Sequence, residues 1–337
     1  MDSSRFACRV DHESVAPSAL PAPVRVVGRL HWAWLAAVRV IRTRPRPSRS
    51  ARLRDMISTT AHPDAAAPDR LSDWYATSDD GALAGVLGFR DAAGGVHLSK
   101  TMMLAELTAV MDSCPDRDPE AVAHAVLTDN VLGKPTGSAR RLALSRLNTL
   151  YGILTPKPVQ LAALKLWPWS AAGRPLLTVL CALAREPLLR QTAGVVLRAP
   201  PGTSVRWPDL AAAIAAEYPD RYSPKMMKSL GQNCVSSWTQ SGHLRGRVNK
   251  RRSLAEPSPE AAAFAALLGT IAGFGGPALL RSPWMGLLDR SEADLLSLLR
   301  RAESAGLARV RAGGGVVQID VRRPMAEALE VPHLADR

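Results

Sequence analysis

The chain has 337 residues, 47% of them hydrophobic and 22% charged, with a formal net charge of +13. This length and apolar content predict two or three globular domains with cores of their own. The excess of Lys and Arg favours a polyanionic partner, with nucleic acid ahead of an anionic membrane surface. The longest apolar runs reach about half of the ~20 residues that a membrane span needs. No signal-peptide pattern is present either, so we expect a cytoplasmic protein without a transmembrane segment.

The sequence contains no recognisable catalytic or metal-binding pattern. Its four cysteines are far apart and form no C-x-x-C pair, which indicates reduced core thiols. The histidines never take metal-ligand spacing, and the pair Glu120 and His124 is typical of a solvated helix contact. Gly133-Lys134-Pro135-Thr136 resembles a Walker A loop only in part, because Thr128 stands where the first Gly is required. We therefore expect no cofactor, no metal and no enzymatic activity.

Residues 1–55 differ in composition from the rest of the chain. They contain eleven Arg and four acids, and the run IRTRPRPSRSARLR has no apolar period, which predicts a basic, disordered extension. One interpretation is a basic arm or membrane-surface segment, and the other is a mis-annotated gene start with Met56 as the true initiator. The remaining residues still carry a charge of +6, so the cationic character of the chain does not depend on this segment.

Residues 99–151 predict three helices with a basic final one. The predicted N-terminal signals are Ser99, Asp118-Pro119 and Thr136-Gly137-Ser138. The third helix, residues 139–151, carries three candidate DNA contacts: Arg140, Arg141 and Arg146. This block is compatible with a helix-turn-helix, and equally with a plain helical bundle whose Arg side chains lie over the core.

Residues 206–254 hold the strongest functional pattern. Asp209 is placed to cap a helix over 210–218, and Ser223-Pro224 begins a second helix that Gly242 stops near Ser241. A basic hairpin or loop follows, and between Arg221 and Ser253 there are eight Lys or Arg residues and no acid. This layout predicts a winged helix-turn-helix, with a recognition helix for the major groove and a cationic wing for phosphates.

Specific roles follow from the chemistry of the side chains. Amide and ammonium groups read base edges in the major groove, and the candidates on the second helix are Lys225, Lys228, Gln232 and Asn233. Phosphate contacts are assigned to the cations of the predicted wing, namely Arg245, Arg247, Lys250, Arg251 and Arg252. His243, at the start of this wing, is read either as a phosphate contact or as an exposed loop residue.

The C-terminal part repeats the order of helix and hairpin. Ser291 is expected to cap an amphipathic helix over 292–304, and alternation with a Gly-rich turn predicts a β-hairpin over 307–321. Acids on the helix favour a packing role over direct DNA contact.

Together these signals predict a mainly α, multi-module protein with winged helix-turn-helix-like modules and short β-hairpin wings. The expected divisions are a basic extension (1–55), an N-terminal helical domain (56–172), a winged-helix module (173–257), a C-terminal winged-helix-like module (258–324) and a tail (325–337).

The order of these motifs resembles the BrxA family of BREX bacteriophage-exclusion systems, over about Val96 to Val321. HLSKTMMLAEL is similar to the family's opening helix, and EAVAHAVLTDNVLGKPTGSARRLALSRLNTL to its signature segment. LLTVLCALAREPLLRQ, residues 206–254 and SEADLLSLLRRAESAGLARVRAGGGVVQID resemble the following segments. The resemblance implies a bacterial, non-enzymatic, double-stranded DNA-binding protein of antiviral defence. The Arg-rich first 55 residues depart from the family.

Two other functions stay open at this stage. The winged helices would make protein contacts if the chain were an adaptor or scaffold for other BREX proteins. Members of the family have also been likened to NusB-type RNA-binding antitermination proteins, and a basic helix serves RNA as well as duplex DNA.

Overall fold

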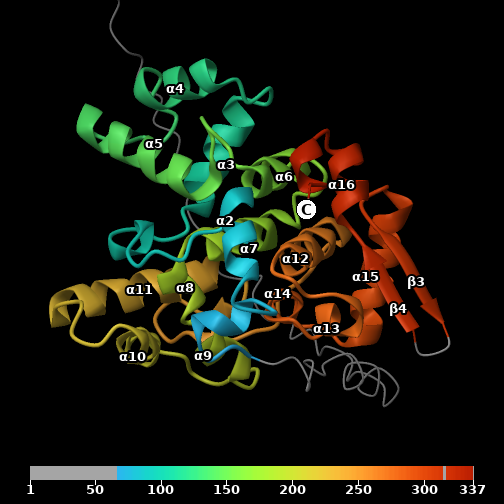
Figure 1. The fold of residues 1–337 in the computed structure, drawn as a ribbon. Helices are drawn as coiled ribbons and strands as arrows, with labels where there is room; N and C mark the ends of the chain where they lie inside the picture. Colours follow the sequence, from blue (N-terminus) through green and yellow to red (C-terminus); the bar gives the residue numbers. More distant parts are fainter. Residues whose placement is uncertain (1–66, 314–315, 337) are drawn as a thin grey trace, which may run out of the picture. The chain divides into compact units, whose positions relative to one another are not determined.

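The computed structural model (Figure 1) describes residues 67–313 and 316–336. They belong to the second of two compact units, residues 56–337, and the predictions for residues 1–55 lie outside them. The described part is mainly helical, with two small antiparallel sheets of two strands each. The expectation of a mainly α protein is therefore confirmed.

The first group of elements is a set of helices, of which α4 and α5 have side-chain caps. It comprises η1 (Leu71–Trp74), α2 (Asp80–Leu87), η2 (Val96–Leu98), α3 (Leu104–Ser113), α4 (Pro119–Leu127), α5 (Gly137–Tyr151) and α6 (Pro158–Leu166). The Asp118 carboxylate accepts a hydrogen bond from Ala121 N at 2.8 Å, and Thr136 Oγ1 accepts one from Ala139 N at 3.1 Å. These two caps are the ones that the sequence predicts for α4 and α5.

The core is built around α7 (Arg174–Arg185) and α12 (Pro259–Ile271), which pack against each other. Every residue from Leu176 to Ala184 is buried, because α5, α6, α8 (Pro187–Arg190) and α11 (Pro224–Gln240) surround α7. α12 buries ten of its thirteen residues, and its alanines let neighbouring helices approach closely. Helices that are apolar on all sides are typical of a protein interior.

The middle of the chain contains two consecutive helices followed by a hairpin. After α9 (Ala193–Arg198) come α10 (Trp207–Glu217), α11, β1 (Leu244–Arg245) and β2 (Arg251–Arg252). β1 and β2 are antiparallel, with Leu244 opposite Arg252. The extended segment in front of α10 lies along the other edge of β2, since Arg252 N donates to Thr203 O at 2.8 Å and Val205 N donates to Lys250 O at 3.0 Å.

The C-terminal part also combines helices with a hairpin. It comprises α13 (Gly276–Leu280), α14 (Pro283–Gly286), α15 (Glu292–Ser304), β3 (Arg309–Gly313), β4 (Val316–Asp320), α16 (Arg322–Ala328) and η3 (Pro332–Leu334). Ser291 Oγ accepts from Asp294 N at 3.2 Å, as expected of a cap, and β3 pairs with β4 antiparallel. All three modules share one hydrophobic cluster, and the domain divisions made from the sequence stay a prediction.

Two predicted helix starts are wrong. α10 begins at Trp207, three residues before the expected start, because Asp209 sits inside the first turn and accepts from Arg206 N at 2.9 Å. Ser99 caps no helix, since α3 begins at Leu104 after Met103, whose backbone is left-handed at φ 56°. In both cases the polar residue satisfies a different partner from the one that local spacing suggests. Within the described residues, no helix is both long and apolar enough to cross a membrane.

The crossing of α10 and α11 depends on a glycine. A Cβ added at Gly231 would lie 2.5 Å from Trp207 O and 3.3 Å from Ala211 Cβ, so only Gly lets the two backbones meet. Gly85 in α2 offers the opposite case, because no atom lies within 4 Å of a Cβ added there.

We predict that Gly231→Ala lowers the free energy of unfolding by about 1–3 kcal/mol, because overpacking outweighs the gain in helix propensity. Gly85→Ala is the matched control and should be neutral or stabilising by up to about 1 kcal/mol. Urea unfolding followed by tryptophan fluorescence measures both. Equal effects of the two substitutions would contradict a tight crossing.

Candidate nucleic-acid interface

α11 has a buried face and a cationic, exposed face. Leu230, Cys234 and Trp238 are fully buried against the rest of the molecule. On the opposite side the exposed residues Lys225, Lys228 and Gln232 recur at helical spacing and therefore form one stripe. The boundaries, cap and buried face of this helix agree with the sequence prediction.

The β1–β2 hairpin (residues 244–252, the basic hairpin) extends beside α11. Gly246 at φ 114° makes the turn possible, because a Cβ there would lie 2.2 Å from Asn249 O. Arg247 is exposed at the tip beside Val248, whose side chain is 85% exposed. Lys250 Nζ donates to Gly246 O at 2.5 Å, which holds this ammonium group over the turn.

A groove separates α11 from the basic hairpin. It has a volume of about 360 Å³, and its walls include Arg206, Trp207, Gln232, Val248, Asn249 and Lys250. Residues from α10, α11 and the hairpin therefore meet in one concave surface. Gln232 is the only predicted base-reading residue among these walls, and Lys250 the only predicted phosphate contact.

Asn233 is not available as a base reader. Its Nδ2 donates to His97 O at 2.9 Å, so the amide faces η2 rather than solvent. It lies one position after Gln232, and successive residues on a helix point about 100° apart. Asn233 faces inward because its hydrogen-bond partner His97 lies in η2, 136 positions away in the sequence.

Arg252 is also not a phosphate contact. Its guanidinium is 1% exposed and pairs with the Asp289 carboxylate, with Nη1 donating to Oδ2 at 3.0 Å. Asp289 Oδ2 also accepts from Ala255 N at 2.9 Å. The pair joins the basic hairpin to the segment between α14 and α15. Arg252 therefore has a structural role, since a buried charge needs a paired and hydrogen-bonded partner.

Of the other hairpin cations, Arg245, Arg247 and Arg251 are exposed and Lys250 is half-buried. Arg245 pairs with Glu256 at 3.0 Å, with both side chains largely in solvent, and Arg251 Nη1 donates to Gly202 O at 2.8 Å. Exposed ion pairs of this kind contribute little to stability and are easily exchanged. Arg245 and Arg251 consequently keep their charge at the surface together with Arg247 and Lys250.

The three arginines of α5 have different surroundings. Arg140 Nη1 donates to Leu127 O at 2.8 Å, so its guanidinium caps the C-terminal end of α4 and is not free for phosphate. Arg141 is exposed, with a single contact of 3.3 Å to Ser138 Oγ. Arg146 is half-buried and donates to Ser99 Oγ at 2.8 Å. Of the three, Arg141 has the most open position.

A buried polar network fixes α11 to its neighbours, and sequence analysis missed it. Glu186 accepts from Val96 N at 3.0 Å and contacts His97 Nδ1 at 3.2 Å, while His97 Nε2 contacts Ser237 Oγ at 2.9 Å. The order Ser, His, Glu resembles a catalytic triad. All three side chains are fully buried, however, and Ser237 Oγ also accepts from Met102 N at 2.9 Å. The network is closed to a substrate and has a structural role.

His243 does not fit either prediction made for it. It is fully buried, with Nε2 2.8 Å from Leu287 O and Nδ1 2.8 Å from Ser241 Oγ. Burial lowers the pKa of His243, although Asp289 partly opposes this effect, so the imidazole is neutral near pH 7. It packs against Trp238 and supports the hairpin from inside.

The cysteines of the described residues are free and buried, in agreement with core thiols. Burial raises the pKa of Cys181 to about 12 and that of Cys234 even further. Neither is therefore a thiolate near pH 7. In residues 67–336, apart from the gap at 314–315, no cluster of His, Cys, Asp and Glu is arranged to hold a metal ion.

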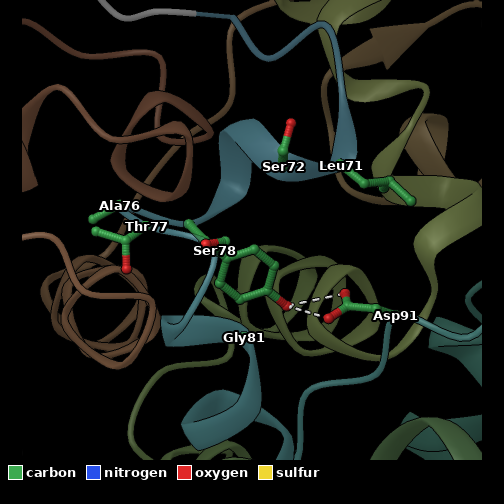
Figure 2. A pocket seen from close by; sticks show the side chains of 8 residues that line it. Leu71, Ser72, Ala76, Thr77, Ser78, Gly81 and Asp91 are labelled. Carbon is green, nitrogen blue, oxygen red and sulfur yellow. Dashed lines mark hydrogen bonds between the residues drawn. The ribbon is translucent and has the colours of Figure 1, made fainter.

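A second cavity, of about 420 Å³, lies between η1 and the start of α2 (Figure 2). Tyr75 donates to both oxygens of Asp91, at 2.9 and 3.0 Å, as the dashed lines in Figure 2 show. Arg190, whose side chain is fully buried, pairs with the same carboxylate at 2.6 Å. Burial raises the pKa of Tyr75 to about 12. Because the phenol stays protonated and the carboxylate is already paired, this cavity lacks a free acid–base couple.

No protein-family model matches the chain, and no curated protein is significantly similar to it in sequence.

We predict that Arg252→Ala lowers the free energy of unfolding by about 3–5 kcal/mol, because it leaves the Asp289 carboxylate buried without its partner. Arg251→Ala, the neighbouring exposed position, should cost no more than about 1 kcal/mol. Chemical unfolding of both variants measures the difference. A similar loss for the two would mean that the buried pair has no special role.

Proposed function

We propose that this chain is a non-enzymatic, double-stranded DNA-binding protein. α11 would enter the major groove and the basic hairpin would contact the backbone. The main support is the arrangement of two cationic elements. α11 has an exposed cationic stripe, and the cationic hairpin lies beside the same groove.

The topology around α11 supports a winged helix-turn-helix. The chain passes from an extended segment (residues 202–205) through α10 and α11 into β1 and β2, and the extended segment pairs with β2. In this arrangement the second helix is the recognition helix and the loop between the strands is the wing. α12 to β4 repeats helices followed by a hairpin, with α13 packed against β4. We extend the winged-helix interpretation to that module as well.

The proposed contact residues are the predicted ones on α11 and the basic hairpin whose side chains are not engaged inside the protein. Base edges would be read by Gln232, Lys225 and Lys228, because amide and ammonium groups match the acceptors and donors of the major groove. The phosphate contacts would be Arg245, Arg247, Lys250 and Arg251. Asn233, Arg140 and Arg252 are left out, since each is engaged inside the protein.

We further propose that the chain is a BrxA-type component of a BREX phage-defence system. This step rests on the resemblance of the motifs between Val96 and Val321. An adaptor role within such a system is the second candidate. It is favoured by the C-terminal hairpin, where Val316 is 69% exposed on β4 and would suit a protein contact.

We predict a strong salt dependence of duplex binding. The four hairpin cations assigned to phosphates would give a log–log slope of about −3.6 if each contacts one phosphate. Arg247→Ala with Lys250→Ala should flatten this slope by about 1.8, because two phosphate contacts are lost. Titration of a labelled duplex at several salt concentrations measures the slope, and an RNA hairpin competitor tests the RNA alternative.

The matched control for that experiment is Arg300→Ala with Arg301→Ala, which removes the same charge from an exposed part of α15. It should leave the slope unchanged. Binding that is absent, or independent of salt, would contradict the proposed function. A preference for the RNA hairpin would replace duplex DNA by RNA as the ligand.

We predict that reversing the charge of the hairpin, by Arg247→Glu with Lys250→Glu, abolishes phage protection in a host that carries the system. DNA binding requires those cations, whereas an adaptor that uses the C-terminal hairpin does not. The measurement is protection together with co-purification of the neighbouring system proteins. Full protection by the charge-reversed variant would favour the adaptor.

A further inference from the structure

One short segment touches both α5 and α11. Arg146 on α5 donates to Ser99 Oγ at 2.8 Å, and Asn233 on α11 donates to His97 O at 2.9 Å. Residues 97 and 99 are two positions apart, which limits their Cα separation to about 7 Å. The two helices are therefore held on either side of this segment, as Figure 1 shows for the chain in front of α3.

Both helices leave their N-terminal halves in solvent. The C-terminal half of α5 is buried through Leu147, Leu150 and Tyr151, and that of α11 through Cys234 and Trp238. α5 and α11 extend to the same side of the described unit in Figure 1. Their exposed halves therefore lie on the same side of the described unit, and η2, which contacts both helices, lies between them.

The three segments that form this side carry cations and no acids. Neither α5, α11 nor residues 92–101 contain Asp or Glu. Lys100 is exposed on the connecting segment, Arg141 on α5, and Lys225 and Lys228 on α11. In the part of the chain that the structure describes, no side chain pairs with the Lys100 ammonium. Lys100 is thus a free cation between two helices that each present cations of their own.

We infer that α5 and α11 form one composite binding surface, joined by Lys100, on which a single DNA duplex contacts both helices. The inference rests on the proposed function and extends it from one module to two. The sequence pattern did not single out Lys100, because its proposed phosphate contact depends on its position between the two helices in the fold.

The dimensions of a duplex fit this arrangement. α5 and α11 each pack against η2, so η2 lies between the two helices. The major groove is about 12 Å wide and admits one helix. With α11 in the groove, α5 cannot enter it as well, and Lys100 and Arg141 instead reach the phosphates along the groove's edge. A set of neighbouring cations suits a polyanion with closely spaced charges, which a duplex provides at about one charge per 1.7 Å.

The test compares Lys100→Ala with Arg141→Ala against the Arg300→Ala, Arg301→Ala control, in the full chain and on a labelled duplex of about 30 base pairs. Two additional phosphate contacts make the expected slope for the wild type steeper, from about −3.6 to about −5.4. The double variant should lose about 1.8 of that slope and should shorten the hydroxyl-radical footprint at one end. The control should change neither, and thermal unfolding verifies that all variants are folded.

The outcomes separate this inference from the proposed function. If Lys100→Ala with Arg141→Ala leaves slope and footprint unchanged while Arg247→Ala with Lys250→Ala flattens the slope, the duplex contacts the α11 module alone and the composite surface is wrong. If neither pair changes the slope, the proposed function fails together with the inference. Retained DNA binding with loss of a co-purifying protein in the Lys100 variant would assign the α5 side to a protein partner and would also overturn it.

Discussion

The position of α11 depends on one buried carboxylate. Glu186 is fully buried at the start of α8, where it accepts hydrogen bonds from Val96 N and His97 N and contacts His97 Nδ1. A buried carboxylate is costly unless its oxygens are satisfied, so η2 must stay in place to supply these groups. Gly95 permits the approach, since a Cβ there would lie 2.4 Å from the carboxylate. His97 Nε2 in turn contacts Ser237 Oγ on α11. This contact fixes the orientation of α11 relative to the α7–α8 junction.

Because α11 is fixed in this orientation, some of its polar residues face the protein interior and others face solvent. Asn233 and Ser237 lie on the inner side, where they bind η2, and Gln240 Oε1 accepts from Leu104 N at 3.0 Å on the same side. Lys225, Lys228 and Gln232 lie on the outer side and remain in solvent. Rigid support of a recognition element improves the precision with which it meets a partner. The polar inner face of α11 therefore serves the outer face that carries the proposed contacts.

Local signals in the sequence were sufficient for the elements around the candidate interface. Ser223-Pro224 and Gly242 mark the ends of α11, and the basic run after it predicts the hairpin, because caps and turns act over a few residues. The roles of individual cations were not predictable in the same way. Arg252 and Asp289 are 37 positions apart, and nothing local distinguishes Arg252 from the exposed Arg251. Asn233 and Gln232 are adjacent and chemically alike, yet only the fold decides which of them faces η2.

Net charge consequently overstates the cationic surface that a polyanion meets. Arg190, Arg252 and Arg140 all count toward +13, but the first two side chains are buried in ion pairs and the third caps α4. The charges that matter for association are those that are not buried, and they include cations of α11, the basic hairpin and Lys100. Salt screens exposed charges far more than buried pairs. The salt dependence of DNA binding therefore depends on the surface cations, whereas the free energy of unfolding depends on the buried ion pairs.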